Sequence, residues 1–498
     1  MTVVYVDDVY INSNTFTNNQ IIEEVNCNYT KWENNSMRAG FMNCYNLKSV
    51  SNINQNVTNM GATFWSCSNL VNAPDIPNSV VNMASTFYNC SSLVNAPAIP
   101  NSVNNITRVD VTHYYAWYNE NYQSGMYYWG TLSNTPNVGD TVYRISSYGS
   151  PSAYGTVKSL GSDESGNYIV PSKASSYNFY INGTKDIDYE YVYGFFQHCT
   201  NLVDAPALPD GITDMRYTFS NCRSLVNAPA IPNSVVNMYY TFNSCYNLVD
   251  APAIPNSVTN MGWTFSGCMN LVNAPVISNS VIDMNHAFAF CSNLVNPPVI
   301  PNSVINLCDA FSTCNNMITA PAIPNSVANM AYTFVACSKL TTAPVLPDSV
   351  DNLTSTFYNC RGLVNPPVIP NSVTMMGQAF SLCTNLITSP EIPNSVTWLE
   401  GAFDNCINLV SVSNIGSSVN DMRTVFRNCG NITGDIYIHS ENITNAYQCF
   451  YNTSLTKNVY IPFQNNGVNT ATYNAFTSAG YTTDGSVNGV YLKDINNL

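Results

Sequence analysis

Cysteines recur along this chain every 23 residues, and this period constrains the fold more than any other feature. They begin with Cys44, Cys67 and Cys90, and they resume at Cys199 in an unbroken series that ends at Cys429. These fourteen cysteines mark fourteen copies of one sequence unit. A unit this short cannot bury a core by itself, so neighbouring copies must stack and share one. The period therefore predicts a repeat solenoid.

The unit from Val258 to Val281 shows which positions face the shared core. The positions that are apolar in nearly every copy are those of Met261, Phe265, Cys268, Leu271, Ile277 and Val281. The first three are spaced as on one face of a short helix or 3-10 segment, which predicts a short helical turn. The segment Leu271–Ile277 predicts a short extended strand that its proline interrupts. We therefore expect one short parallel strand and one short helical turn in each coil.

The phrase Ile-Pro-Asn-Ser-Val-x-Asn-Met-x-x-x-Phe-x-x-Cys-x-x-Leu resembles the BspA-type leucine-rich repeat, whose unit contains I-P-x-S-V followed by A-F-x-x-C-x-x-L. The resemblance covers about three quarters of the chain. One departure is that the Pro-Ser-Val segment is shifted by one residue, so that Met precedes Phe by four residues rather than five. The resemblance implies a leucine-rich-repeat-like solenoid, bacterial surface adhesion or a phage-borne relative, and no catalytic centre.

One insertion and two atypical ends divide the chain further. Cys90 and Cys199 lie 109 residues apart, so about 86 residues are inserted into a single coil after Ile106. The aromatic-rich runs of this insertion predict a small antiparallel β-domain. The last coils lose the repeat pattern, as capping repeats do, and a β-α-β C-terminal cap follows. We expect an N-terminal cap (1–36), repeats 1–3 (37–106), the inserted β-domain (107–191), repeats 4–14 with a degenerate repeat (192–455), and the C-terminal cap (456–498).

The charge balance excludes some classes of partner. The formal net charge is −14, with only 16 Lys and Arg residues, which predicts no binding to nucleic acid or to anionic membranes. No stretch approaches the roughly 20 apolar residues that a membrane helix needs. Met1–Thr17 lacks the order of basic, apolar and small residues typical of a secretory signal, and no anchor follows Lys493. We expect a location on a virion or outside a cell, with no membrane insertion.

Catalytic and metal-binding chemistry is not indicated. The chain has no C-x-x-C pair and its four histidines are scattered, so we predict no metal and no cofactor. The cysteine ladder is interpreted as a column of buried, reduced thiols, although stacked coils would bring cysteines within disulfide reach. Asp163 and Glu164, flanked by glycines, are better explained as a solvated turn than as a carboxylate pair for glycoside cleavage. We predict no catalytic residue.

The strongest functional signal is a stripe of aromatic residues. Two residues before the Phe position, successive copies carry Tyr217, Tyr240, Trp263, His286, Asp309 and Tyr332, whereas other copies have small or polar residues there. Rigid aromatic side chains supply contact area at low entropic cost. Two interpretations remain open: a ligand-contact patch, or rings that cover the solenoid flank against the inserted domain or a sister subunit. The candidate ligand-binding residues are Tyr217, Tyr240, Trp263, His286, Tyr332, Tyr239, Tyr246 and Arg216 on the repeats, and Trp117, Tyr127, Tyr128 and Trp129 in the insertion.

The leading hypothesis is a non-enzymatic adhesion or receptor-binding protein that recognises a host-surface glycan or protein. The absence of a recognisable signal favours a virion-associated tail or head fibre. The alternatives are a bacterial cell-surface BspA-like adhesin, a structural virion decoration protein that binds sister subunits or other virion proteins, and an enzyme that acts on surface glycans.

Overall fold

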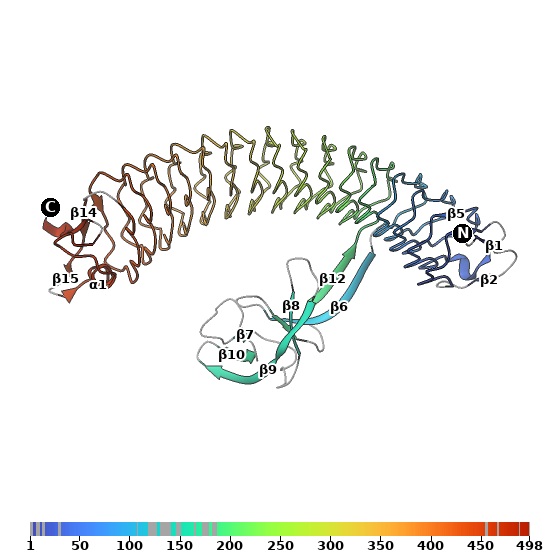
Figure 1. Cartoon of the computed structure of the whole chain (residues 1–498), viewed down its shortest axis with the longest axis horizontal. Helices are drawn as coiled ribbons and strands as arrows, with labels where there is room; N and C mark the ends of the chain where they lie inside the picture. Colours follow the sequence, from blue (N-terminus) through green and yellow to red (C-terminus); the bar gives the residue numbers. More distant parts are fainter. Residues whose placement is uncertain are drawn as a thin grey trace. The chain divides into compact units, whose positions relative to one another are not determined.

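The computed structural model shows two compact units, Met1–Thr107 with Gly194–Leu498, and Arg108–Tyr193. The described residues are 3–5, 10–11, 15–27, 31–106, 108–117, 127–129, 141–145, 151–163, 166–171, 179–181, 187–453, 457–465, 468–487 and 489–497, with side chains described only outside 1–14 and 107–193. In the first unit the coils stack side by side in sequence order (Figure 1).

The Met-to-Cys segment of each coil is a series of tight turns, and the prediction of a helical turn was wrong. In the coil of Met261, the N–H groups of Thr264 and Cys268 donate to carbonyls three residues earlier, at 3.1 and 3.0 Å. The N–H groups of Met261 and Phe265 instead donate to the next coil, at 3.0 and 2.9 Å. Trp263 and Gly267 have φ values of 57° and 77°. A residue with left-handed backbone at every fourth position interrupts a helix. As a result, every second N–H of this segment points to the next coil and donates to a carbonyl there.

The extended side of the coils also differs from the expected short strand. Successive coils are joined there by isolated parallel bridges, as between Asp250 and Asn273 and between Asn273 and Asn296. A proline follows within two residues in each of these coils. Because proline has no N–H, the ladder cannot extend beyond a single bridge. A second row of single bridges joins the residues that precede the Met position, as between Asn237 and Asn260.

The core is made of columns, meaning residues at equivalent positions of successive coils. Phe265 is fully buried, and its ring stacks on those of Phe242 and Phe288 at centroid distances of 5.6 and 5.5 Å. This phenylalanine column runs from Phe16 to Phe450. It passes directly from Phe87 to Phe196, with centroids 5.6 Å apart, so the insertion leaves the stack of coils unbroken.

The cysteine column lies beside the phenylalanine column and is buried, as predicted. Each thiol donates to the carbonyl of the Phe in the preceding coil, as Cys268 Sγ does to Phe242 O at 3.2 Å. The thiols are free. Burial raises their pKa well above the ordinary value, as for Cys268. The thiol is a weak donor, and the Phe carbonyl can accept a second hydrogen bond besides the one from its own coil. The cysteine side chain supplies that second bond.

The second unit is an antiparallel β-sheet. Its strands are β6 (Arg108–Trp117), β7 (Tyr127–Trp129), β8 (Thr141–Ile145), β9 (Pro151–Asp163), β10 (Gly166–Pro171), β11 (Phe179–Ile181) and β12 (Ile187–Tyr193). They form one seven-stranded sheet in the order β12-β6-β11-β8-β9-β10-β7. The first and last strands of the insertion pair antiparallel from Arg108 with Tyr193 to Tyr114 with Ile187, which brings the two ends of the insertion together.

Short sheets flank the coils at both ends. At the N-terminal end, β1 (Val3–Tyr5), β3 (Glu24–Asn26) and β5 (Ser49–Ser51) form one parallel sheet, β2 (Tyr10–Ile11) pairs with β4 (Lys31–Trp32), and the 3-10 turn η1 (Glu33–Asn35) follows. At the C-terminal end, β13 (Ile436–Tyr437), β14 (Lys457–Ile461) and β17 (Val490–Asp494) form one parallel sheet. In the chain between β14 and β17 lie a hairpin of β15 (Gln464–Asn465) with β16 (Val468–Asn469) and the helix α1 (Ala471–Ser478). The 3-10 turn η2 (Ile495–Asn497) ends the described chain.

Candidate functional site

Four of the predicted residues form one continuous stack of rings, here called the aromatic ladder: Tyr217, Tyr240, Trp263 and His286. The centroid distances along it are 4.8, 5.0 and 3.7 Å, and the rings are parallel to within 14°. All four side chains are half-buried. The stripe that the sequence indicated is therefore a physical unit across four coils.

The backbone explains why these side chains line up. All four residues are left-handed, with φ between 53° and 59°, in the column where the N–H bonds to the next coil, as Trp263 N does to Asn285 O at 2.9 Å. Each coil thus repeats the same direction of the Cα–Cβ bond. A bulky residue is disfavoured in this conformation, and offset stacking contributes about 0.5–1.5 kcal/mol per pair in return.

The stacking decides which part of each ring a ligand could reach. Rings about 5 Å apart leave no room for a ligand between them, so the inner faces of Tyr240 and Trp263 are used within the ladder. A sugar lying flat on one of these inner faces is therefore incompatible with the geometry. A ligand that contacts the ladder would therefore approach the outward edges of the rings.

Asp309 closes one end of the ladder. Its Oδ2 lies 3.3 Å from His286 Nε2 and accepts a long contact from Cys308 Sγ at 3.6 Å. Burial lowers the pKa of His286 to about 4 and raises the pKa of Asp309 to about 6. At neutral pH the imidazole is therefore neutral, with Nε2 facing the Asp309 carboxylate and Nδ1 lying against the side-chain oxygen of Asn285.

Tyr239 widens the ladder sideways. Its ring meets Tyr240 edge to face at 4.6 Å and Tyr217 at 6.0 Å. Gly262 lies at the equivalent position of the next coil, and a Cβ added there would lie 3.0 Å from the Tyr239 ring. The absence of a side chain at this glycine therefore leaves space for the ring. Tyr239 and the aromatic ladder therefore form a single aromatic surface.

The other predicted residues of the repeats do not join this stack. Arg216 pairs with Asp214 of its own coil at 2.8 Å. Tyr246 lies under the Arg223 guanidinium, 5.3 Å from its centroid. Tyr332 is separated from His286 by Asp309 in the column, and its side chain is 42% exposed. Trp117 lies in β6, and Tyr127, Tyr128 and Trp129 form β7, but their side chains fall outside the described set.

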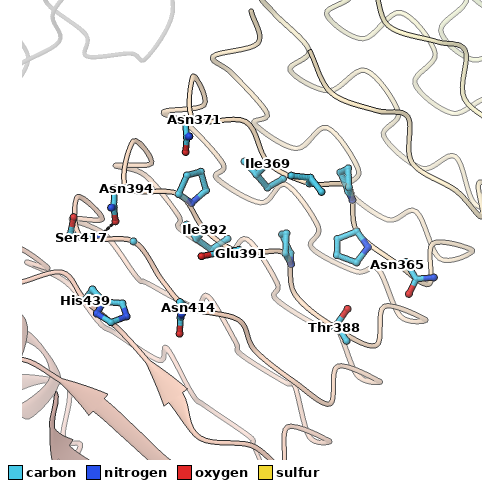
Figure 2. Close-up of a pocket in the computed structure, with 16 residues that line it drawn as sticks. Asn365, Ile369, Asn371, Thr388, Glu391, Ile392, Asn394, Asn414, Ser417 and His439 are labelled. Atoms are coloured by element: carbon cyan, nitrogen blue, oxygen red, sulfur yellow. Dashed lines mark hydrogen bonds between the residues drawn. The ribbon is translucent and has the colours of Figure 1, made fainter. Parts of the chain in front are cut away.

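The structure also shows a depression that the sequence interpretation missed (Figure 2). It encloses about 940 Å³ on the proline side of the last coils. Its rim carries Glu391, Asn414 and His439, all exposed. From the sequence, His439 is interpreted only as decay of the last coil towards its cap, and Glu391 and Asn414 are not singled out. The signal that could have found them is that each replaces an alanine, a valine or a proline of the inner coils.

Two of the coils that line the depression lack one of the bridges that join most of the other coils. Where a coil has Ala-Pro, the alanine N–H can donate to the next coil, as Ala274 N does to Asn296 O at 3.1 Å. Pro366 occupies this position and has no N–H. Among the described residues, no parallel bridge joins Asn365 to Thr388, although bridges join the coils on either side. Pro297 removes the same N–H from an inner coil, and no bridge from Asn296 to Thr319 is found among the described residues either. The depression itself extends further, over four successive coils from Asn365 to His439.

Comparison with known proteins identifies the repeats. The BspA type leucine rich repeat region matches in six copies, over residues 7–116, 192–295, 284–400 and 352–482. The chain belongs to the BspA-type leucine-rich repeat family. The resemblance drawn from the sequence is thereby confirmed, and the departures in spacing lie within what this family accommodates. Among curated proteins, no sequence matches this chain.

Two solved structures are similar to this BspA-type chain. A leucine-rich repeat protein from Bacteroides ovatus is 18% identical, with a TM-score of 0.41, over 73% of this chain and 100% of its own length. A leucine rich cell surface protein from Faecalibacterium prausnitzii is also 18% identical, with a TM-score of 0.38, over 74% of this chain and 97% of its own.

Within the described ranges, no group of three or more His, Cys, Asp or Glu side chains is placed to hold a metal ion. None of the described helices is long and apolar enough to cross a membrane. The groups that the described surface does present are aromatic edges, amides and a few carboxylates, which suit recognition of a ligand.

Proposed function

We propose that this chain is a non-enzymatic bacterial cell-surface adhesin that contacts a macromolecular ligand through the outward edges of the aromatic ladder and Tyr239. Membership of the BspA-type family supports the bacterial surface over the virion favoured by the sequence alone, because that family implies surface adhesion. The observation that carries the choice of site is the stacking of Tyr217, Tyr240, Trp263 and His286 at 3.7–5.0 Å.

The ladder supports a contact role because the fold does not require it. In the same column other coils have Ala62, Ser85 or Gly401, and the phenylalanine and cysteine columns are equally buried in those coils. Small or polar side chains at this position therefore leave the core intact. Half-buried rings held in fixed orientations lose little entropy when a partner covers them, which is typical of an interface anchor.

The test is attachment of the whole chain to surfaces coated with extracellular-matrix proteins or mucins. On the coating that the parent chain binds, we expect the double variant Tyr240→Ala, Trp263→Ala to need at least a tenfold higher concentration for half-saturation. The matched control is Trp65→Ala, Tyr88→Ala, which removes another stacked pair, with centroids 4.0 Å apart, outside the ladder. Equal attachment by the parent and the ladder variant, with both folded, would overturn the assignment of this surface.

The enzyme hypothesis receives no comparable support. Cleavage of a glycosidic bond generally requires two carboxyl groups that flank the bond. The carboxylates around the ladder are engaged otherwise, since Asp309 lies 3.3 Å from His286 Nε2 and Asp214 pairs with Arg216. The inserted unit, in which Asp163 and Glu164 lie, is proposed as a second binding module rather than as a catalytic domain.

A further inference from the structure

We infer that the depression at the C-terminal end of the coils is a second binding site, for a neutral saccharide, separate from the aromatic ladder. Its floor and walls include Ile369, Ile392 and the rings of Pro366, Pro367 and Pro390. These present rigid C–H surfaces. A volume of about 940 Å³ lies within the range of small-ligand sites, roughly 300–1,000 Å³, that combine an apolar lining with a few placed polar groups.

The polar groups at the rim are free to bind. Glu391, Asn414 and His439 line the same part of the depression in Figure 2, and their side chains have no hydrogen-bond partner among the described residues. A carboxylate accepts, an amide both donates and accepts, and an imidazole does either. Sugar hydroxyls also donate and accept, so this set can pair with several of them at once. Asn365 and Thr388 extend the same chemistry along the opposite wall.

These polar residues are departures from the repeat rather than part of it. In the column of Glu391, the preceding coils have Val276, Val299, Ala322, Val345 and Val368, and the valines are 85–88% exposed. Exposure shows that the core does not select the residue at this position. The next coil carries Asn414 in the same column. In the neighbouring proline column, Gly416 and His439 follow Pro393. The polar substitutions are therefore concentrated along the depression.

A peptide is a poorer fit than a saccharide. A peptide that added as a strand would need unpaired backbone groups at an edge. Here the N–H of Ile392 donates to Asn414 O at 3.1 Å, and the N–H of Ile415 donates to Tyr437 O at 3.0 Å. Among the described residues that line the depression, Glu391 is also the one carboxylate, whereas cleavage of a sugar polymer requires a pair. The arrangement favours binding without hydrolysis.

The experiment uses the full chain on an array of neutral oligosaccharides of four to six hexose or N-acetylhexosamine units, with titration calorimetry on the array hits. We expect Glu391→Ala and Asn414→Ala each to weaken binding at least tenfold. Alanine already occupies the Glu391 column at Ala322, so folding should be unaffected, which thermal unfolding would verify. Val345→Ala is the matched control in the same column outside the depression, and it should bind as the parent does.

The outcomes separate this inference from the proposed function. The ladder variant Tyr240→Ala, Trp263→Ala should bind the oligosaccharide normally even if it loses attachment to matrix or mucin coatings. Absence of any neutral saccharide that binds the parent chain would overturn the inference. So would a bound saccharide whose affinity is unchanged in Glu391→Ala and Asn414→Ala. Preferential binding of peptides, blocked by these two substitutions, would also overturn it.

Discussion

His286 Nε2 lies 3.3 Å from Asp309 Oδ2 at the end of the aromatic ladder, and burial shifts the pKa values of the two groups in opposite directions. The pKa of His286 falls from 6.5 to about 4, and the pKa of Asp309 rises from 3.8 to about 6. On acidification the folded chain therefore protonates the carboxyl group before the imidazole, in the reverse of the usual order. Both shifts fall in the window between pH 4 and 6.5, where their effects on stability oppose each other.

The first prediction concerns this opposition. The unfolded chain takes up a proton at His286 near pH 6.5 and the folded chain only near pH 4, so this residue costs stability as the pH falls. As the pH falls, Asp309 takes up a proton near pH 6 in the folded chain but only near pH 3.8 in the unfolded chain. This residue therefore increases the stability of the fold as the pH falls, and that contribution is lost as the pH rises above 6. Between pH 7 and pH 4.5, Asp309→Asn should therefore lose more stability than the parent, and His286→Gln should lose less. Urea midpoints at the two pH values measure this, and identical pH dependence in all three proteins would contradict it.

The second prediction concerns the phenylalanine column. Phe265 is fully buried and stacks on both sides, so Phe265→Ala should destabilise the chain by about 3–5 kcal/mol. Because a stack of coils need not unfold in one step, the measurement should follow the urea midpoint by both circular dichroism and fluorescence. The control is Val276→Ala, in a coil position that is 87% exposed, and it should change stability by less than about 0.5 kcal/mol. A loss below about 1 kcal/mol at Phe265 would mean that the column does not hold the coils together.

The third prediction concerns the thiols. Cys308 lies outside the cysteine column and is half-exposed, whereas the other described cysteines are buried. Burial and the neighbouring Asp309 raise the pKa of Cys308 to about 12, so alkylation should be slow at neutral pH and should accelerate about tenfold per pH unit between pH 7 and 9. Peptide mass mapping should find Cys308 modified first and the column only after denaturation. Cys308→Ser should abolish the early reaction. Equal labelling of Cys268, or a Cys222–Cys245 bridge, would contradict the buried-thiol column.

The sequence predicts the solenoid well because its signal is repeated many times. Each coil places Phe and Cys at the same position, and one error in one coil does not change the period. The local backbone could not be predicted in the same way. The spacing of Met261, Phe265 and Cys268 fits a helix face and also fits consecutive turns, and the difference lies in two left-handed residues, Trp263 and Gly267. A tryptophan gives no hint of positive φ.

The candidate site was predictable in part for a related reason. The aromatic stripe is visible as a column, and four of its members do stack. Which ring faces remain exposed depends on the distance between coils, which the sequence does not state. The depression depends on how the extended sides of four successive coils are placed in space, which the sequence does not state. Its polar rim also looks like ordinary decay of the repeat towards a cap, and only the placement of Glu391 beside His439 and Asn414 distinguishes the two.

The last prediction tests the left-handed column itself. Gly401 has φ of 61° and Gln378, in the preceding coil, has φ of 56°, so neighbouring coils place glycine and a longer side chain in one conformation. The left-handed region costs a residue with a Cβ about 1–2 kcal/mol relative to its preferred conformation. A Cβ at Gly401 would meet Gln378 Cγ and Thr424 Oγ1 at 3.4 Å, an ordinary contact. Gly401→Ala should therefore destabilise by about 1 kcal/mol through the backbone alone, and Gln378→Gly should stabilise by up to about 1 kcal/mol. Chemical unfolding of the two single variants and of the double variant gives both signs. If Gly401→Ala were neutral while Gln378→Gly were destabilising, the strain would not lie in this column, and the stacking of the aromatic ladder would have no backbone cost to offset.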